Sequence, residues 1–248
     1  MTLTIGSLFA GIGGLELGLE RAGLGPVRWQ VEIDERCRRV LARHWPDAER
    51  FADVRAVGAR TLAPVDVVCG GFPCQDISLA GANRGLEGER SGLWYEYQRI
   101  IAEIRPRFVV VENVSGLVRR GLDTVLEGLW SLGYAVEGTR MRASDLGAPH
   151  RRERLFLIAH TDGELVRLES ERGEPDASER GNALALDASG AGRVAGRVHR
   201  PWAPEPRICR VAHGIPERVE RLRALGNAVV PACASVVGAR VMAIARGA

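Results

Sequence analysis

One cysteine stands where a thiol could act as a nucleophile. Cys74 follows two glycines, a phenylalanine and a proline in VDVVCGGFPCQDISL, at the end of an apolar run. A thiolate attacks electrophilic carbon well once its pKa is lowered. The alternative for a single Pro-Cys pair is a turn with a small apolar side chain beneath it. The rest of the chain decides between these two interpretations.

A glycine loop and two carboxylates suggest a nucleotide-like ligand. The loop FAGIGG follows one apolar run, Glu32 ends the next, and Asp53 ends a third, shorter one. In open α/β sheets a glycine turn lets the backbone approach a ligand, and an acid at the second strand end accepts hydrogen bonds from ribose hydroxyls. Asp53 could accept from an adenine amino group. The pattern predicts an adenosine-containing cofactor; ordinary sheet-end turns with a solvated acid are the alternative.

Alternating strand and helix patterns would bring these residues to one edge of a sheet. Runs such as VDVVCGG and RFVVVEN are continuously apolar, as in strands covered on both faces of a parallel sheet. Between them, SGLWYEYQRIIAEIRP has Leu93, Tyr97, Ile100 and Ile104 at helical spacing. VSGLVRRGLDTVLEGLWSLG predicts a further helix, and AVEGTRMRA and RLFLIAH predict two more strands. The fold class is therefore α/β, with a doubly wound sheet.

Composition limits the class of protein. The 248 residues carry a formal charge of +3, and every basic residue counted with Lys and Arg is Arg. The five cysteines show no CxxC spacing, so we expect neither a disulfide framework nor a metal site. No basic-then-apolar signal segment is present, and the apolar runs fall short of a membrane span. We expect a cytoplasmic protein with no membrane partner.

The chain divides into three parts by pattern. Residues 1–160 form the predicted α/β domain. Residues 161–206 are rich in Gly, Ala, Arg and acidic residues without a sustained period, which indicates an irregular variable region. Apolar patterning returns in 207–248, where a helix beginning near Pro231 could pack back on the first domain.

Six motifs in order resemble those of the cytosine-C5 DNA methyltransferase family. They are FAGIGGLELGLERAG, the EID at Glu32, GGFPCQ, VVVENV, HRRERLFLIA and RLRALGNAVVP. The resemblance covers about four fifths of the chain, all except the variable region. It implies a Rossmann-like methyltransferase sheet, S-adenosyl-L-methionine as methyl donor and double-stranded DNA as substrate. A cognate restriction endonuclease is a further expected partner, and we expect a monomer.

The resemblance gives Cys74, Glu112, Arg152 and Arg154 catalytic roles. Cys74 would add to C6 of a flipped cytosine, because C5 is a poor nucleophile until the ring is activated. Arg152 and Arg154, projecting from one strand edge at i and i+2, would help to lower the pKa of that thiol. Glu112 would hydrogen-bond N3 and the exocyclic amine. The polar loop DISLAGANRGLEGER would close over the base; a solvated inert loop is the alternative.

By the same resemblance, eleven residues would hold the cofactor. They are Phe9, Gly11, Gly13, Glu32, Ile33, Asp53, Val54, Pro73, Leu93, Asn227 and Val229.

The sequence departs from the family pattern in two places. His150 stands where the family usually has Gln before the two arginines. It could make a structural hydrogen bond or act as a catalytic base. By the resemblance, the variable region 161–206 is the target-recognition region, and it is short for the family. Its late cluster of Arg193, Arg197 and Arg200, with Arg207 just beyond, could contact bases or phosphates or could belong to a solvated tether.

Three rival functions stay open at this point. The RNA branch of the family uses the same machinery, but its Cys-Phe-Thr signature is absent. A catalytically inert DNA-binding relative would not need all four catalytic residues. A nicotinamide oxidoreductase would be expected to carry GxGxxG.

Overall fold

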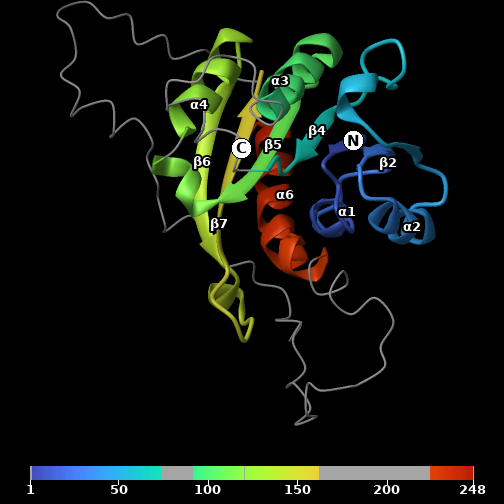
Figure 1. Ribbon diagram of the computed structural model, residues 1–248. Coiled ribbons are helices and arrows are strands. Elements are labelled where there is room, and N and C mark those ends of the chain that lie inside the picture. The colour runs from blue at the N-terminus through green and yellow to red at the C-terminus, as the bar shows by residue number, and fades with distance from the viewer. Residues whose placement is uncertain (1, 74–91, 120, 162–223, 248) are drawn as a thin grey trace, which may run out of the picture.

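The computed structural model describes residues 2–73, 92–119, 121–161 and 224–247, whose course is coloured in Figure 1. Within these ranges seven strands form one sheet in the order β3-β2-β1-β4-β5-β7-β6. The strands are β1 Ile5–Leu8, β2 Val27–Val31, β3 Glu49–Phe51, β4 Val67–Gly70, β5 Phe108–Val114, β6 Ala135–Arg142 and β7 Glu153–His160. The order of β1 between β2 and β4 is that of a doubly wound sheet, as the sequence predicts.

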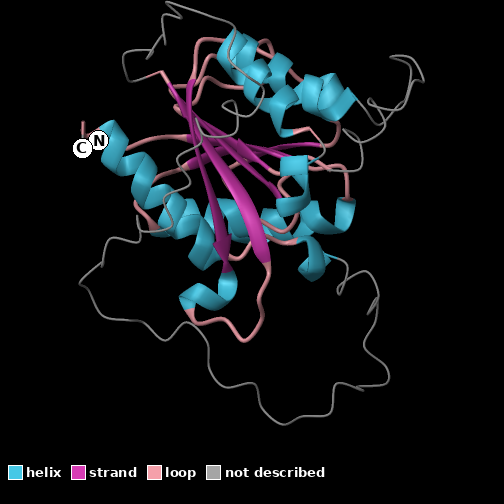
Figure 2. Cartoon of the chain, turned by 90° about the vertical axis from the view of Figure 1, so that its left-hand side faces the viewer, coloured by secondary structure: helices cyan, strands magenta, loops and turns pink. Residues whose placement is uncertain are grey.

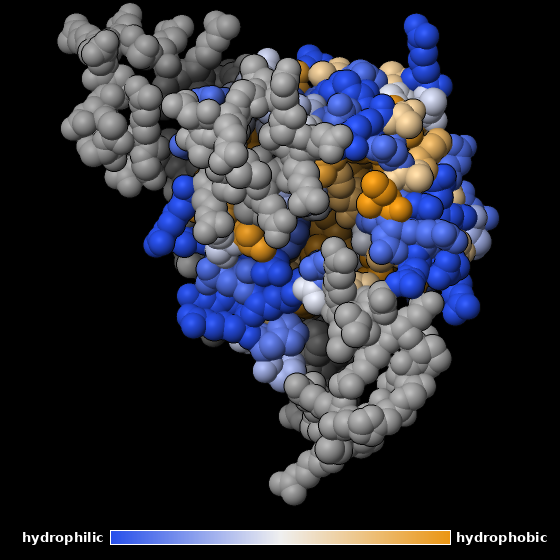
Figure 3. Space-filling model, viewed as in Figure 1, coloured by the Kyte–Doolittle hydropathy of each residue, from blue (hydrophilic) through white to orange (hydrophobic). Residues whose placement is uncertain are grey.

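The sheet lies between two layers of helices, which Figure 2 shows from the side. One layer holds α1 Gly14–Arg21, α2 Glu35–His44 and α6 Pro231–Ala245; the other holds α3 Gly92–Ile104 and α4 Leu122–Ser131. Each layer seals its own hydrophobic core against the sheet. On the face seen in Figure 3 the described residues are mostly hydrophilic, with an apolar area near the middle. The α/β class and the helix starting at Pro231 are confirmed.

Strand direction decides where the chemistry gathers. β1 to β5 are parallel, so their carboxyl ends meet at one edge, whereas β7 runs antiparallel to both β5 and β6. The beginning of β7 therefore lies at that same edge. The register pairs Glu112 with Phe156 and Val114 with Arg154. This brings the ENV and RER segments together although about forty residues separate them in the chain.

Two predicted elements differ in detail. The helix expected over VSGLVRRGLDTVLEGLWSLG is a 3-10 turn, Ser115–Arg119, followed by α4, with Gly121 at the start of α4. β3 ends at Phe51, and Asp53 instead caps a short 3-10 helix, η1 (Val54–Ala56), by accepting a hydrogen bond from the Arg55 amide. Asx-type capping competes with strand pairing, which accounts for the early strand end.

Small residues let α6 lie directly on α1. A Cβ at Gly18 would collide with Ala234, and one at Gly238 would lie 2.7 Å from the Ala22 Cβ. The stretch Ala224–Ala245 is long and apolar enough to cross a membrane by length and composition, so the expectation that every apolar run is too short was wrong. In this fold the buried side of α6 forms core with α1 and the sheet.

A buried carboxyl lies beneath the glycine loop. Glu16, in the first turn of α1, is fully buried and accepts a hydrogen bond from Gln30 Nε2 at 3.4 Å. Its other oxygen has no hydrogen-bond partner among the described residues. Burial raises the pKa of Glu16 from 4.5 to about 7, and Glu20 adds to the rise.

We expect Glu16→Gln to stabilise the fold at alkaline pH. The folded protein holds the proton to a higher pH than the unfolded chain, so stability falls as pH rises from about 4.5 towards about 7. At about pH 8 the variant should gain up to about 3 kcal/mol in free energy of unfolding, and near pH 4.5 almost nothing. Urea unfolding across pH would measure this, with exposed Glu35→Gln as control. A gain that does not depend on pH would contradict the assignment.

Candidate active site

The glycine loop is held against the second strand end by Glu32. The Gly11 amide donates to Glu32 Oε2 at 2.7 Å, and the Asp34 amide donates to Oε1 at 2.9 Å. Phe9, Gly11 and Gly13 all have positive φ, and a Cβ at Gly13 would also collide with Trp45. Each carboxylate oxygen keeps a free lone pair, so Glu32 can brace the loop and still accept from a ligand hydroxyl.

The other predicted cofactor residues stand around this strand end. Ile33 is 72% exposed, an uncovered apolar side chain directly after Glu32. The Glu32 amide donates to Phe51 O at 3.0 Å, which joins the second and third strand ends beside Asp53. Val54 is buried and Leu93 partly buried in the core cluster under α3. An apolar face with carboxylates on either side fits the flat base and hydroxyl-bearing ribose of an adenosyl group.

Val229 reaches the glycine loop from the far end of the chain, and Asn227 lies two residues before it. Gly14, at the start of α1, is in such close contact with the Val229 carbonyl that a Cβ there would clash. A cavity of about 600 Å³ lies between Ile12 and Trp45 on one side and Val229 on the other, with His150 also in its wall. Trp45 could not be predicted as a site residue from the sequence, because an aromatic residue after a helix is no signal by itself.

The second half of the site joins the GGFP loop to β5. Asn113 Nδ2 donates to Phe72 O at 3.0 Å in the interior. A Cβ at Gly71 would lie 2.7 Å from Glu112 Oε2, so a larger residue in the loop would displace the carboxyl. Pro73 follows and is exposed. The loop that leads into Cys74 is thus fixed against Glu112. Asn113 is the middle residue of the ENV motif, and this bond gives it a structural role.

Glu112 is a buried acid paired with Arg154. Its carboxyl is 10% exposed, and Oε1 lies 3.0 Å from Arg154 Nε. The contact is an ion pair without the alignment of a good hydrogen bond, since Oε1 has no hydrogen-bond partner among the described residues. Burial raises the pKa of Glu112, and Arg154 and Arg152 offset only part of that rise. The rise extends to higher pH the range in which Glu112 carries a proton that it can donate to a ring nitrogen.

Arg152 and Arg154 do not project together. β7 begins at Glu153, and Arg152 precedes it with a φ of 25°, which breaks the alternation expected of a strand. Arg152 Nη1 donates to Gly226 O at 2.6 Å and Nη2 to Ala228 O at 2.5 Å. The shared-edge geometry predicted from the i, i+2 spacing is wrong: Arg154 faces Glu112, and Arg152 holds the backbone on both sides of Asn227.

The described cysteines are poor nucleophiles. Cys37, Cys69 and Cys233 are all buried and free. Burial raises the pKa of Cys37 and of Cys233 to about 11 and that of Cys69 well above 9.0. None of the three carries a useful thiolate fraction near neutral pH.

Several predicted features lie outside the described residues. They are Cys74, the loop DISLAGANRGLEGER, most of the variable region, and the cluster Arg193, Arg197, Arg200 and Arg207. Their roles stay predictions.

Known proteins carry the same pattern. Residues 3–185 match the family of C-5 cytosine-specific DNA methylases. The chain is 39% identical to the type II methyltransferase M.Eco47II of Escherichia coli over 163 residues, covering 63% of this chain and 39% of that protein. It is 33% identical to M.Bsp6I of Bacillus sp. (strain RFL6) over 162 residues, covering 63% and 51%. The chain thus spans about half or less of these relatives' length.

Solved structures support the fold. The methyltransferase EhMeth of Entamoeba histolytica superposes with a TM-score of 0.56 at 16% identity, over 71% of this chain and 58% of that one. At this identity the likeness concerns the fold alone. The family match and the arrangement around Glu112 agree, and the chain belongs to the C-5 cytosine-specific DNA methylase family.

Proposed function

We propose that this protein transfers a methyl group from S-adenosyl-L-methionine to C5 of cytosine in double-stranded DNA. The observation that carries the proposal is the buried Glu112–Arg154 pair, fixed beside the loop that leads into Cys74. A structural ion pair alone does not account for a glycine packed against its carboxyl, nor for the neighbouring Asn113 amide that holds the Phe72 carbonyl.

The residues divide the chemistry between them. Cys74 forms a bond to C6 of the flipped cytosine, and Glu112 donates a hydrogen bond to N3 as charge develops on the ring. Arg154 holds the Glu112 carboxyl in place. After C5 has gained the methyl group, with S-adenosylhomocysteine as the leaving group, a base takes the C5 proton. The bond between C6 and sulfur then breaks, which returns the Cys74 thiolate.

The cofactor residues fit an adenosyl group. When bound, S-adenosyl-L-methionine supplies the methyl group as an electrophile on its sulfonium sulfur. Glu32 would accept from the ribose hydroxyls and Asp53 from the adenine amino group, with Ile33, Val54 and Leu93 as apolar walls. The remainder of the cofactor would be bordered by Phe9, Gly11, Gly13, Pro73, Asn227 and Val229.

We expect Glu32→Ala to weaken cofactor binding more than it slows methyl transfer. Two charge-assisted hydrogen bonds are lost, which costs roughly 2 to 3 kcal/mol in binding free energy. The exposed Glu49, at the start of β3, offers a matched control as Glu49→Ala. Calorimetric titration with S-adenosylhomocysteine would compare the three proteins. Equal affinities for wild type and Glu32→Ala would remove Glu32 from the site.

The partners follow from the proposed reaction. DNA is the proposed substrate. We also propose a restriction endonuclease of matching specificity as a partner, because this chain is related to the type II methyltransferases named above. We further propose that the protein acts as a monomer in the cytoplasm.

Bisulfite sequencing tests the function directly. DNA from a host that expresses the protein should contain protected cytosines in a short sequence context, and DNA from a host that expresses Glu112→Gln should contain none. Protected cytosines only in RNA would assign the protein to the RNA branch instead.

A further inference from the structure

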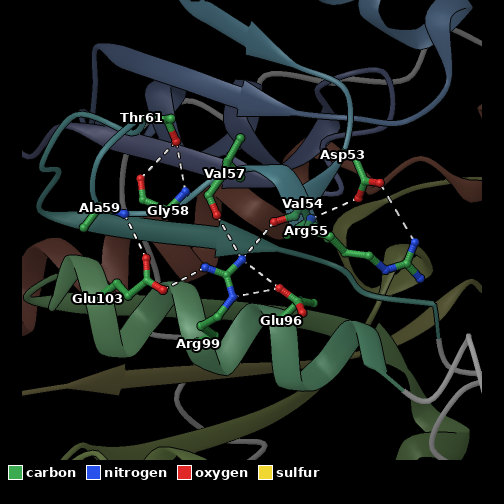
Figure 4. Close-up of polar contacts among 10 residues, drawn as sticks. All are labelled: Asp53, Val54, Arg55, Val57, Gly58, Ala59, Thr61, Glu96, Arg99 and Glu103. Carbon is green, nitrogen blue, oxygen red and sulfur yellow. Dashed lines mark hydrogen bonds and ion pairs between the residues drawn. The ribbon is translucent and has the colours of Figure 1, made fainter. Parts of the chain in front are cut away.

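A single arginine of α3 holds the short segment that follows β3. Figure 4 shows the Arg99 guanidinium between α3 and residues 54–59. Arg99 Nη2 donates to Val54 O at 3.0 Å and to Val57 O at 2.9 Å, and the bonded residues are 45 and 42 positions apart in the chain. Arginine is suited to this contact because its planar fork presents donors in several fixed directions.

Two carboxylates of the same helix fix the direction of that guanidinium. Arg99 Nε donates to Glu96 Oε2 at 2.8 Å, and Nη1 donates to Glu103 Oε1 at 2.8 Å. The side chain is 34% exposed, so these contacts are partly shielded from water. The second Glu103 oxygen accepts from the Ala59 amide at 2.9 Å, and a Cβ at Gly58 would collide with it. Arg99 and Glu103 therefore clamp both ends of residues 54–59.

The clamped segment carries half of the proposed adenine site. Asp53 and Val54 lie at its beginning, and the Val54 carbonyl is one of the groups that Arg99 holds. Leu93, which packs against the core cluster that contains Val54, belongs to the first turn of α3 itself. Tyr97 of the same helix packs 6.2 Å from the Phe9 ring, between ring centres. The helix that carries Arg99 thus contributes Leu93 to the proposed adenine pocket and contacts Val54 and Phe9.

We propose that Arg99 is a positioning residue that sets affinity and selectivity for the adenine part of the cofactor. It does so by holding Asp53 and Val54 at a fixed distance from Leu93. The inference rests on the proposed function, since it takes these residues as the adenine site. Arg99 lies outside the proposed adenine site and belongs to none of the six sequence motifs.

Binding measured without DNA tests the inference. Wild type, Arg99→Met and Arg99→Lys would be titrated with S-adenosylhomocysteine and with its inosine counterpart, which has oxygen in place of the adenine amino group. Arg99→Met should weaken S-adenosylhomocysteine binding by roughly tenfold, which equals about 1.4 kcal/mol. Arg99→Lys should lie between, because an ammonium group lacks the planar fork. Preference for the amino compound should shrink in the same order.

Arg240→Met is the matched control. Arg240 of α6 makes a similar ion pair, with two hydrogen bonds of 2.7 and 2.9 Å to Glu137 of β6. The Arg240→Met variant should have a lower melting temperature than wild type. Its affinity for S-adenosylhomocysteine, and its preference for that compound over the inosine counterpart, should be unchanged. In turnover assays Arg99→Met should raise KM for S-adenosyl-L-methionine while kcat and KM for DNA stay near wild type.

The outcomes separate this inference from the proposed function. If Arg99→Met melts earlier but binds both compounds as wild type does, Arg99 only supports the fold and the inference is wrong. If Arg99→Met fails to fold, Arg99→Lys and Glu103→Gln decide by the same two affinities. Wild type that binds neither compound would overturn the proposed cofactor, and the inference with it.

Discussion

Cys74→Ser is expected to slow methyl transfer to cytosine by on the order of 10⁴-fold or more, as removal of a nucleophile does. An alcohol has a far higher pKa than a thiol, so almost no anion is available at neutral pH to add to C6. Binding of S-adenosylhomocysteine should stay close to wild type, because the proposed cofactor residues are unchanged. Single-turnover transfer of labelled methyl groups to DNA would measure the loss.

Cys37→Ser provides the comparison for that experiment. Cys37 is buried, and burial raises the pKa of its thiol to about 11, so it offers no thiolate. The rate of this variant should stay within a few fold of wild type. A Cys74→Ser protein that methylates DNA at an appreciable rate would remove Cys74 from the reaction.

Glu112→Gln is expected to lower kcat by roughly 10²- to 10⁴-fold, the range for loss of a general acid. Glutamine has the same shape and can still hydrogen-bond N3 and the exocyclic amine, but it cannot give up a proton. The buried position and the contact with Arg154 keep the side chain in place. Glu153→Gln is the control, because Glu153 lies at the same strand edge and pairs with Arg142 at 2.7 Å.

The pH dependence of the rate gives this variant a second readout. Burial raises the pKa of Glu112, so the protonated acid persists to a higher pH than for an exposed carboxyl. The wild-type rate should fall as pH rises through that pKa, and the Gln variant should lack the fall. A variant with the full wild-type rate, or with the same falling limb, would show that Glu112 is no acid here.

Local patterns predicted the parallel part of the fold. The β-branched runs around Val67 and Val109, and the glycines after Phe9, depend on short-range preferences that a single segment reveals. The placement of the proposed cofactor residues near successive strand ends follows, because parallel strands bring their carboxyl ends together. This part of the site needed only the order of strands and helices.

Contacts between distant segments could not be predicted in the same way. Nothing local to Arg152 reveals that its partners are the carbonyls of Gly226 and Ala228, more than seventy residues away. Arg99 shows only the i, i+4 spacing of an ordinary surface pair with Glu103, while its bonds to Val54 and Val57 depend on how the sheet places α3. The burial of Glu16 could not be predicted either, because glutamate is rarely fully buried.

The covalent step is tested most directly with DNA that carries 5-fluorocytosine in the target site. Fluorine cannot leave as a cation, so wild type, S-adenosyl-L-methionine and this DNA should together give a complex that survives a denaturing gel. Omission of the methyl donor, or Cys74→Ser, should abolish it. A stable complex that persists in Cys74→Ser, or that maps by peptide mass to Cys37, Cys69, Cys209 or Cys233, would contradict the account.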